Sequence, residues 1–159
     1  MKPLIFMALC TVFPIAAHAA LSGVVVAISG GDKLTVMVDQ RLLTFRLGDI
    51  DAPEPGQPFS VRAAQSLARL CLDKAVTVDD GGIDLPRGIF GHVTCAGVDA
   101  QAEQVRRGMA WVYVETPADS SLHSLQAEAR AGGLGLWSDT HPVPPWTWHG
   151  QDRAPREQP

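Results

Sequence analysis

Short hydrophobic runs near the start of the chain predict β-strands. Gly23–Ile28, Leu34–Val38 and Leu42–Leu47 are rich in β-branched residues or alternate between apolar and polar residues. The segments between them, Ser29-Gly30-Gly31-Asp32 and Asp39-Gln40, have the composition of tight turns. Together these runs predict a three-stranded meander.

Helical spacing begins after the Pro-rich stretch Ala52–Pro58. Ser60 can serve as the N-cap of a helix, in which apolar residues recur at Val61, Ala64, Leu67, Ala68 and Cys71. The rest of the chain predicts strands at Ala75–Val78 and Ile89–Cys95, a helix from an Asp99 cap to Arg106-Arg107-Gly108, and a third helix from about Ser121 to Ala131 that stops at Gly132-Gly133. Five short strands with a helix between the third and the fourth favour an α+β fold, a five-stranded OB-type barrel with three α-helices, over a sandwich.

The first 19 residues have the features of a secretory signal peptide. Met1-Lys2 is followed by an apolar run, Pro3–Ala16, and by Ala17-His18-Ala19, a small-x-small cleavage site. The run is shorter than the roughly 20 apolar residues of a membrane span, so we expect cleavage after Ala19 rather than stable membrane insertion. The mature protein is then exported, to the periplasm or the medium, and Cys10 leaves with the signal.

Length and charge fit one domain. The chain has 159 residues, of which 46% are apolar; we expect one domain at residues 20–148, followed by a flexible tail at residues 149–159, and a monomer. Lys2 is one of the 13 Lys and Arg residues, so the mature chain carries 12 of them against 17 Asp and Glu. Because an acidic domain has no general attraction for polyphosphates, a nucleic-acid partner requires a local basic pocket or a metal ion.

Two cysteines remain after export, Cys71 and Cys95. An oxidising compartment favours a disulfide between them, which would stabilise the fold by roughly 3–4 kcal/mol through loop entropy; two buried free thiols are the alternative. The wide spacing argues against a zinc site. His92 and His123 have no partner at ligand spacing, and we expect the four Trp residues to pack in the core rather than to stack on bases.

Candidate chemistry gathers around Arg46 and three carboxylates. Asp51 and Glu54 follow the third predicted strand, and Asp32 lies in the turn that can fold back beside the end of that strand. Carboxylates are ligands that Ca²⁺ prefers, and an arginine fork binds phosphate oxygens in pairs, so the set indicates a phosphodiester site. From spacing alone a structural interpretation is favoured, in which Asp32 and Asp51 stabilise turns and Arg46 pairs with one of them.

A longer set of ordered motifs reverses that preference. Gly-x-Val-Val, Arg-Leu-x-x-Ile-Asp-Ala-Pro-Glu, Val-Arg-Arg-Gly-Met-Ala-Trp and Gly-Leu-Trp follow one another between Gly23 and Trp148, and the segment closes on Pro-Pro-Trp-x-Trp. With these motifs the chain resembles the staphylococcal nuclease (thermonuclease) family. The resemblance implies an OB-type barrel with three helices and Ca²⁺-dependent hydrolysis of phosphodiester bonds in DNA or RNA.

The resemblance also implies roles for individual residues. Asp32, Asp51 and the backbone carbonyl of Ala52 match metal ligands of the family. Glu54 is also expected among the metal-site residues, and it matches the glutamate that holds or activates the attacking water. Arg46 matches the arginine that clamps the phosphate while negative charge develops on it.

Two segments depart from the family pattern. The first turn usually reads Asp-Gly-Asp-Thr but is Gly30-Gly31-Asp32-Lys33 here, so one carboxylate is missing, and Lys33 either neutralises the acidic cluster without Ca²⁺ or points to solvent. Members usually carry Asp-Arg-Tyr-Gly-Arg before the fifth strand, whereas this chain has Asp84-Leu85-Pro86-Arg87-Gly88. Gly88 therefore stands where the last arginine is expected, and Arg87 comes one residue early, which on a strand changes the face of the side chain. Alternatively, the Pro86 turn re-aims Arg87, whose side chain is long enough to reach the phosphate.

Two functional hypotheses follow. In the first, the protein is an exported, Ca²⁺-assisted nuclease in which the three carboxylates organise metal and water, while Arg46 and Arg87 hold the phosphate. In the second, it is a nuclease-derived domain that no longer cleaves and serves as a nucleic-acid- or protein-binding accessory module. Lys33, Gly88 and the acidic charge motivate the second hypothesis.

Overall fold

The computed structural model describes residues 20–84, 88–114 and 120–148. The five longer strands are β1 (Leu21–Ile28), β2 (Lys33–Val38), β3 (Arg41–Leu47), β5 (Ala75–Asp84) and β6 (Gly88–Cys95). They match the predicted runs, with β5 extending six residues past Val78 through an irregular register between Asp80 and Gly82. The predicted signal peptide, the predicted tail at residues 149–159 and Arg87 lie outside the described residues.

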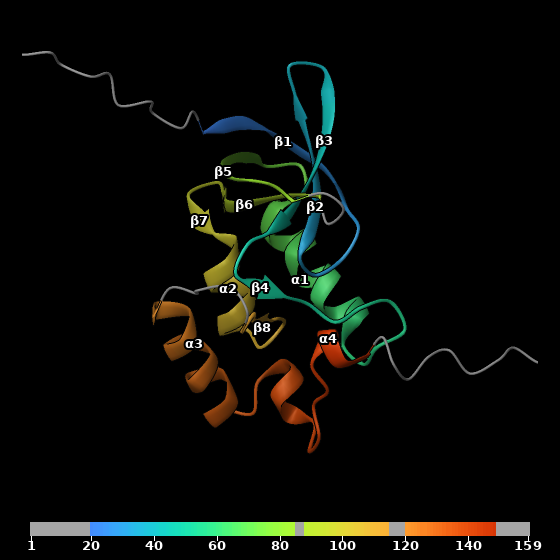
Figure 1. The fold of residues 1–159 in the computed structure, drawn as a ribbon, viewed down its shortest axis with the longest axis vertical. Coiled ribbons are helices and arrows are strands. Elements are labelled where there is room, and N and C mark those ends of the chain that lie inside the picture. Colours follow the sequence, from blue (N-terminus) through green and yellow to red (C-terminus); the bar gives the residue numbers. More distant parts are fainter. Residues whose placement is uncertain (1–19, 85–87, 115–119, 149–159) are drawn as a thin grey trace, which may run out of the picture.

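The strands form a closed barrel. Hydrogen-bonded neighbours follow the order β3-β2-β1-β5-β6, and a parallel pairing of β3 with β6 joins the two ends. In this pairing Phe45, Arg46 and Leu47 lie opposite Ile89, Phe90 and Gly91. Closure leaves no free edge between the first and the last strand, and it confirms the predicted five-stranded barrel. In Figure 1 the turn between β2 and β3 projects beyond the rest of the barrel.

Alternation along the strands fills the barrel with apolar side chains. In β2, for example, Leu34 and Val36 are buried, whereas the side chains on either side of them are not. The fully buried residues of the barrel strands include Val25, Leu34, Phe45, Leu47, Val78 and Val93. This core makes the barrel a rigid base for the loops at its end.

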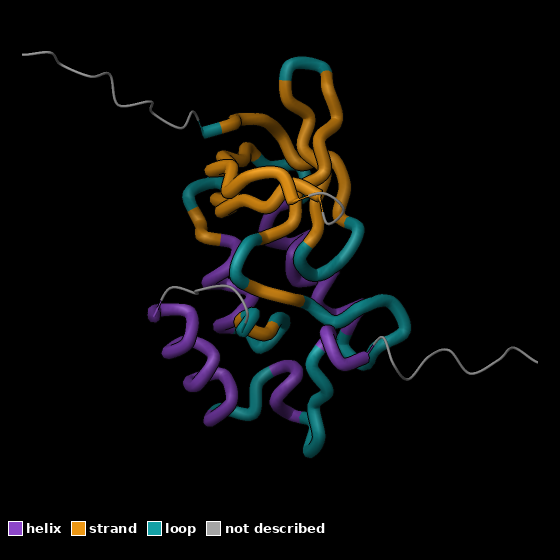
Figure 2. Tube along the Cα trace, viewed as in Figure 1, coloured by secondary structure: helices purple, strands orange, loops and turns teal. Residues whose placement is uncertain are grey.

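The helices gather at one end of the barrel. They are α1 (Ser60–Cys71), α2 (Ala100–Arg106) and α3 (Ser120–Ala131), together with two short elements, η1 (Gly135–Ser138) and α4 (Pro145–Trp148). Figure 2 shows the five longer strands in the upper half of the view and α3 and α4 in the lower half. The three predicted helices are thus confirmed. Three short strands lie near the place where the barrel meets the helices: β4 (Ile50–Asp51), β7 (Val98–Asp99) and β8 (Trp111–Val112). Of these, β4 and β8 also lie in the lower half of the view in Figure 2.

Helix termini confirm two predicted signals and correct one. The Asp99 side chain accepts a hydrogen bond from the backbone N–H of Ala102, as an N-cap does, and Gly108 takes the predicted left-handed conformation with φ of 64°. The prediction that Ser60 caps α1 is wrong. Phe59 occupies that position with φ of 68° and no side-chain cap, because the left-handed turn there brings Ser60 into the first turn of the helix.

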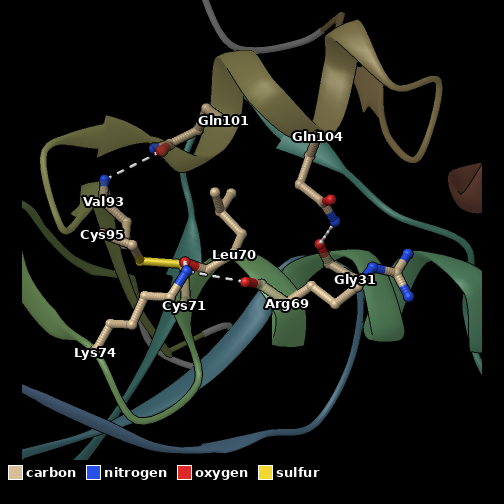
Figure 3. Close-up of a disulfide and its surroundings, with 9 residues drawn as sticks. All are labelled: Gly31, Arg69, Leu70, Cys71, Lys74, Val93, Cys95, Gln101 and Gln104. Carbon is tan, nitrogen blue, oxygen red and sulfur yellow. Dashed lines mark hydrogen bonds between the residues drawn. A yellow bond between two sulfur atoms is a disulfide. The ribbon is translucent and has the colours of Figure 1, made fainter.

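A disulfide between Cys71 and Cys95 ties the end of α1 to the end of β6 (Figure 3). Both cysteines are fully buried. The predicted pairing therefore joins the helix to the barrel from the core side. Within the described ranges, no helix is long and apolar enough to span a bilayer.

Candidate active site

The turn that carries Asp32 is packed against two other elements. A Cβ atom on Gly31 would lie 2.5 Å from the Cβ of Ala63 in α1 and 2.7 Å from the Cβ of Ala52. Only glycine allows this approach. The buried Gln104 side chain of α2 donates hydrogen bonds to the carbonyls of Gly31, at 2.6 Å, and Ala63, at 3.1 Å. These contacts fix the turn next to the loop that follows Asp51.

Arg46 joins two carboxylates, as the predicted fold-back of the first turn requires. Its Nη2 donates to Oδ2 of Asp32 at 2.7 Å and to Oδ1 of Asp51 at 3.3 Å. Asp32 is almost completely buried, with its side chain 4% exposed, and Asp51 and Arg46 keep 14% and 21%. Charge-assisted bonds of this kind are strong when water is excluded. The interpretation from spacing alone expected Arg46 to pair with one of the two aspartates, whereas in the structure it pairs with both.

The rest of the Arg46 guanidinium is held beside an aromatic ring. It lies 5.7 Å from the ring centre of Phe90, its neighbour across the β3–β6 pairing. Its Nε–H is buried and has no hydrogen-bond partner among the described residues. A buried donor without an acceptor is costly. Because this nitrogen is closed to solvent, only the 21% of the Arg46 side chain that stays exposed is open to a phosphate oxygen.

Asp51 is positioned by a short strand pair below the barrel. Ile50 and Asp51 in β4 pair with Val112 and Trp111 in β8, and the backbone N–H of Tyr113 donates to the carbonyl of Asp49 at 2.9 Å. Neither strand has more than two residues. Their pairing still fixes where the chain leaves the barrel toward Ala52, which is 2% exposed.

Glu54 lies at the edge of this group and is paired with Lys33. The Nζ of Lys33 lies 3.8 Å from Oε2 of Glu54, with the side chains 30% and 19% exposed. Lys33 thus neither points away into solvent nor sits between the two aspartates. Asp32, Arg46 and Asp51 form one bonded cluster, and the Lys33–Glu54 pair flanks it.

The cluster is short of positive charge. The pKa of Asp51 is raised to about 7. Burial is the largest cause, followed by the negative charge of Asp32, and Glu54 adds to the shift; Arg46 and Lys33 oppose it without cancelling it. Three carboxylates with two cationic partners therefore leave an uncompensated negative charge.

This charge imbalance and the donor chemistry fit a hard divalent cation. Carboxylate oxygens and a backbone carbonyl, as at Asp32, Asp51 and Ala52, are the ligands that Ca²⁺ prefers. Nonetheless, no three His, Cys, Asp or Glu side chains within the described ranges are close enough together to form a ready metal site. Two carboxylates are gathered, and Glu54 stands apart from them with Lys33.

The opposite wall of the site is formed by β6. Phe90 lies beside Arg46, and Gly88 comes two residues earlier in the same strand, where it pairs with Asp84 in β5. The predicted second arginine, Arg87, falls outside the described residues.

Sequence reasoning missed the buried amides that hold the site together. Gln104 supports the Asp32 turn, and Gln57 bonds to the backbone of Glu54. Gln104 could have been found, because it falls at a helical position shared with apolar residues of α2. Gln57 lies in an irregular loop and carries no such signal. His92, for which the sequence offered no partner at ligand spacing, has a half-exposed imidazole whose Nε2 lies 3.4 Å from Oδ2 of Asp99.

Comparisons with known proteins identify the family. A model of the family described as "Staphylococcal nuclease homologue" matches residues 44–139. The chain is 37% identical over 152 residues to a protein named micrococcal nuclease of Shigella flexneri. The aligned residues cover 89% of the chain and 87% of that protein. It is also 37% identical over 153 residues to Protein ParB of Escherichia coli, covering 89% and 86%.

A third relative extends the same result. An uncharacterized endonuclease of Escherichia coli is 39% identical over 131 residues, which cover 82% of the chain and 86% of that protein. The family match at residues 44–139 contains the Asp51 loop and the residues of β3 and β6 whose pairing closes the barrel. The chain therefore belongs to the staphylococcal nuclease family.

Proposed function

We propose that the protein is an exported nuclease that hydrolyses phosphodiester bonds of DNA or RNA with the assistance of Ca²⁺. The observation that carries the proposal is the Asp32–Arg46–Asp51 cluster, which places an acidic, cation-poor group beside a guanidinium that is partly open to solvent. The relatives named as nucleases support the same activity.

In this proposal each residue of the site has its own role in the hydrolysis. Asp32, Asp51 and the carbonyl of Ala52 would hold Ca²⁺, which when bound supplies positive charge next to the phosphate oxygens. Arg46 donates hydrogen bonds to the phosphate as negative charge develops there. Glu54 takes a proton from the attacking water, whose oxygen forms a bond to phosphorus while the bond to the leaving oxygen breaks. The leaving oxygen is then protonated from solvent.

The test is digestion of single-stranded DNA, double-stranded DNA and RNA by the mature protein, with Ca²⁺ and with a chelator. We expect cleavage with Ca²⁺ that the chelator abolishes, and Glu54→Gln should reduce the rate roughly 100-fold or more, as the loss of a positioned acid–base group does. Equal rates with Ca²⁺ and chelator, or no cleavage of any substrate, would refute the proposal.

The second candidate is a nuclease-derived binding module without cleavage activity. Gly88 favours it, because this residue stands where the family pattern has its last arginine and carries no cationic side chain. Gly88→Arg, combined with Arg87→Gly to restore the usual order, should create cleavage or raise it strongly if the site needs only this group. Cleavage by the unchanged protein at rates that Gly88→Arg does not raise would remove the second candidate.

A further inference from the structure

Gln57 is a buried polar residue that lies between exposed neighbours in an irregular loop. It is 4% exposed, whereas its neighbours Gly56 and Pro58 are exposed. The loop that contains it joins β4 to α1 and begins with the site residues Asp51 and Glu54. A polar side chain is buried in this way only when hydrogen bonds satisfy it.

Two hydrogen bonds with Gln57 engage both backbone polar groups of Glu54, its N–H and its carbonyl. The Glu54 N–H donates to Oε1 of Gln57 at 3.0 Å, and the Gln57 N–H donates to the Glu54 carbonyl at 2.9 Å. The Gln57 side chain thereby fixes a residue that lies between two prolines and cannot use a strand or helix for support. The position of the Glu54 backbone sets where its carboxylate can reach.

The other end of the same amide is anchored far away in the sequence. Nε2 of Gln57 donates to the carbonyl of Val143 at 2.6 Å. A hollow lined by Phe59, Val143 and Trp148 lies beside this bond, so apolar packing does not fully join the two segments there. The amide therefore bridges the Glu54 loop and the segment that leads into α4.

That segment is in turn fixed to the element that positions Asp51. Pro145 is buried, and the ring of Trp146 lies 5.9 Å from that of Trp111 and 5.7 Å from that of Tyr113. Trp111 belongs to β8, which pairs with Asp51 in β4. The Glu54 loop is thus tied to the aromatic group of Trp111, Tyr113 and Trp146 through Gln57 and the Val143 segment. Asp51 is tied to the same group through its strand partner Trp111.

We infer that Gln57 is a positioning residue, which holds Glu54 in register with Asp51 by tying its loop to the Val143 segment. The inference rests on the proposed nuclease function, in which Glu54 handles the attacking water. Gln57 does not touch the substrate in this role and acts through Glu54 alone.

Gln57→Leu, which keeps the volume but removes both side-chain hydrogen bonds, is the test variant. Gln101→Leu is the matched control, because Gln101 is also buried and its amide also bonds to two backbone groups, the N–H of Val93 and the carbonyl of Gly91. Both are to be assayed with Ca²⁺ well below the unfolding midpoint of each variant. We expect Gln57→Leu to lower kcat roughly 10- to 100-fold with little change in KM, since misplacement of a reacting group has this effect, and Gln101→Leu to leave kcat within about twofold.

The double variant Gln57→Leu/Glu54→Gln separates positioning from general damage. If Gln57 acts through Glu54, the double variant is no slower than Glu54→Gln alone. Loss factors that multiply, or a kcat for Gln57→Leu within about twofold of the unchanged protein, would overturn the inference. An equal loss of kcat in Gln101→Leu would do the same.

Backbone amide exchange supplies a readout that does not depend on activity. The Glu54 N–H should be protected in the unchanged protein, lose most of that protection in Gln57→Leu and keep it in Gln101→Leu. Should the unchanged protein not cleave nucleic acid, the proposed function fails, while this exchange pattern still decides whether Gln57 holds Glu54. Unchanged protection in Gln57→Leu would overturn the positioning role.

Discussion

Two arginines show how the same side chain serves different ends in different regions of the molecule. Arg46, 21% exposed, lies between the buried carboxylates of Asp32 and Asp51 at the end of the barrel. Arg130 is exposed and covers the rings of Trp137, at 4.2 Å, and Trp111, at 5.2 Å, at the junction of α3 and η1. Both contact aromatic rings, but only Arg46 is held by buried negative charge.

The difference separates catalysis from stability. Around Arg46, three carboxylates compete for two cations, and the pKa of Asp51 rises to about 7, first because the carboxyl is buried and second because Asp32 is negatively charged. Such uncompensated charge costs stability and is typical of functional sites. Around Arg130, Trp111 packs edge-on against Trp137, with ring centres 4.3 Å apart, and buries apolar area instead. The first region should govern the rate, and Trp137 and Arg130 mainly the free energy of unfolding, because these two residues pack on the ring of Trp111, whereas Asp51 pairs with its backbone.

The largest effect is expected from Arg46→Lys. A lysine ammonium cannot bridge two aspartates and also bind a phosphate in the manner of a planar fork, so kcat on DNA should fall roughly 100- to 1000-fold, as it does when a preorganised donor is lost. Steady-state assays with Ca²⁺ provide the measurement. Arg130→Lys is the control and should leave kcat within about twofold; a similarly small change for Arg46→Lys would end the proposed phosphate role.

Trp137→Ala probes the other region. Removal of a half-buried indole that packs against Trp111 and Arg130 should lower the free energy of unfolding by roughly 2–4 kcal/mol. Urea denaturation followed by circular dichroism measures the change. Below the unfolding transition kcat should stay near that of the unchanged protein, and a selective loss of kcat would show that the two regions are not separable.

Arg130→Met should have a smaller effect on stability. Methionine keeps an apolar stem over the two Trp rings but removes the cation, so the loss should be about 0.5–1 kcal/mol, the range for an exposed cation–aromatic contact. The measurement is again the urea midpoint, compared with that of Arg130→Lys. A loss above about 2 kcal/mol would mean that Arg130 is held by more than its ring contacts.

The smallest effect concerns Glu103, which binds both Arg106 and Arg107 on the surface of α2. Partial burial by itself raises the pKa of Glu103, but hydrogen bonds from Arg107 and Arg106 outweigh it and lower the pKa below its ordinary value of 4.5. The stabilisation is therefore complete above the ordinary pKa and is lost as the pH falls through the folded-state value.

Glu103→Gln should accordingly lose at most about 1 kcal/mol at pH 7, as expected for an exposed ion pair. The difference in free energy of unfolding between Glu103→Gln and the unchanged protein should shrink as the pH falls from about 5 to about 3, the range around the ordinary carboxyl pKa. Thermal unfolding at several pH values measures it. A difference that grows toward acid pH would contradict the lowered pKa.

The sequence was sufficient to predict local structure where patterns are periodic. Alternation in β2 and the helical spacing behind Ser60 located these elements to within a residue or two, and the Asp99 cap and Gly108 marked the bounds of α2. These signals are local, since strand alternation, capping and left-handed stops depend on neighbours in the chain. The cap of α1 was mispredicted because Phe59 takes a positive φ, which a bulky residue rarely adopts and which its sequence therefore does not signal.

Only the tertiary structure decided how the charged residues are partnered. The sequence placed Asp32 and Asp51 near Arg46, but the sharing of one guanidinium nitrogen, the capture of Lys33 by Glu54 and the burial that raises the pKa of Asp51 require the barrel to close. Gln57 reaches a carbonyl 86 residues away, and no local pattern encodes such a bond. Periodicity along the chain determines elements, whereas the strength and partners of a polar group depend on burial and on distances that arise only when those elements pack.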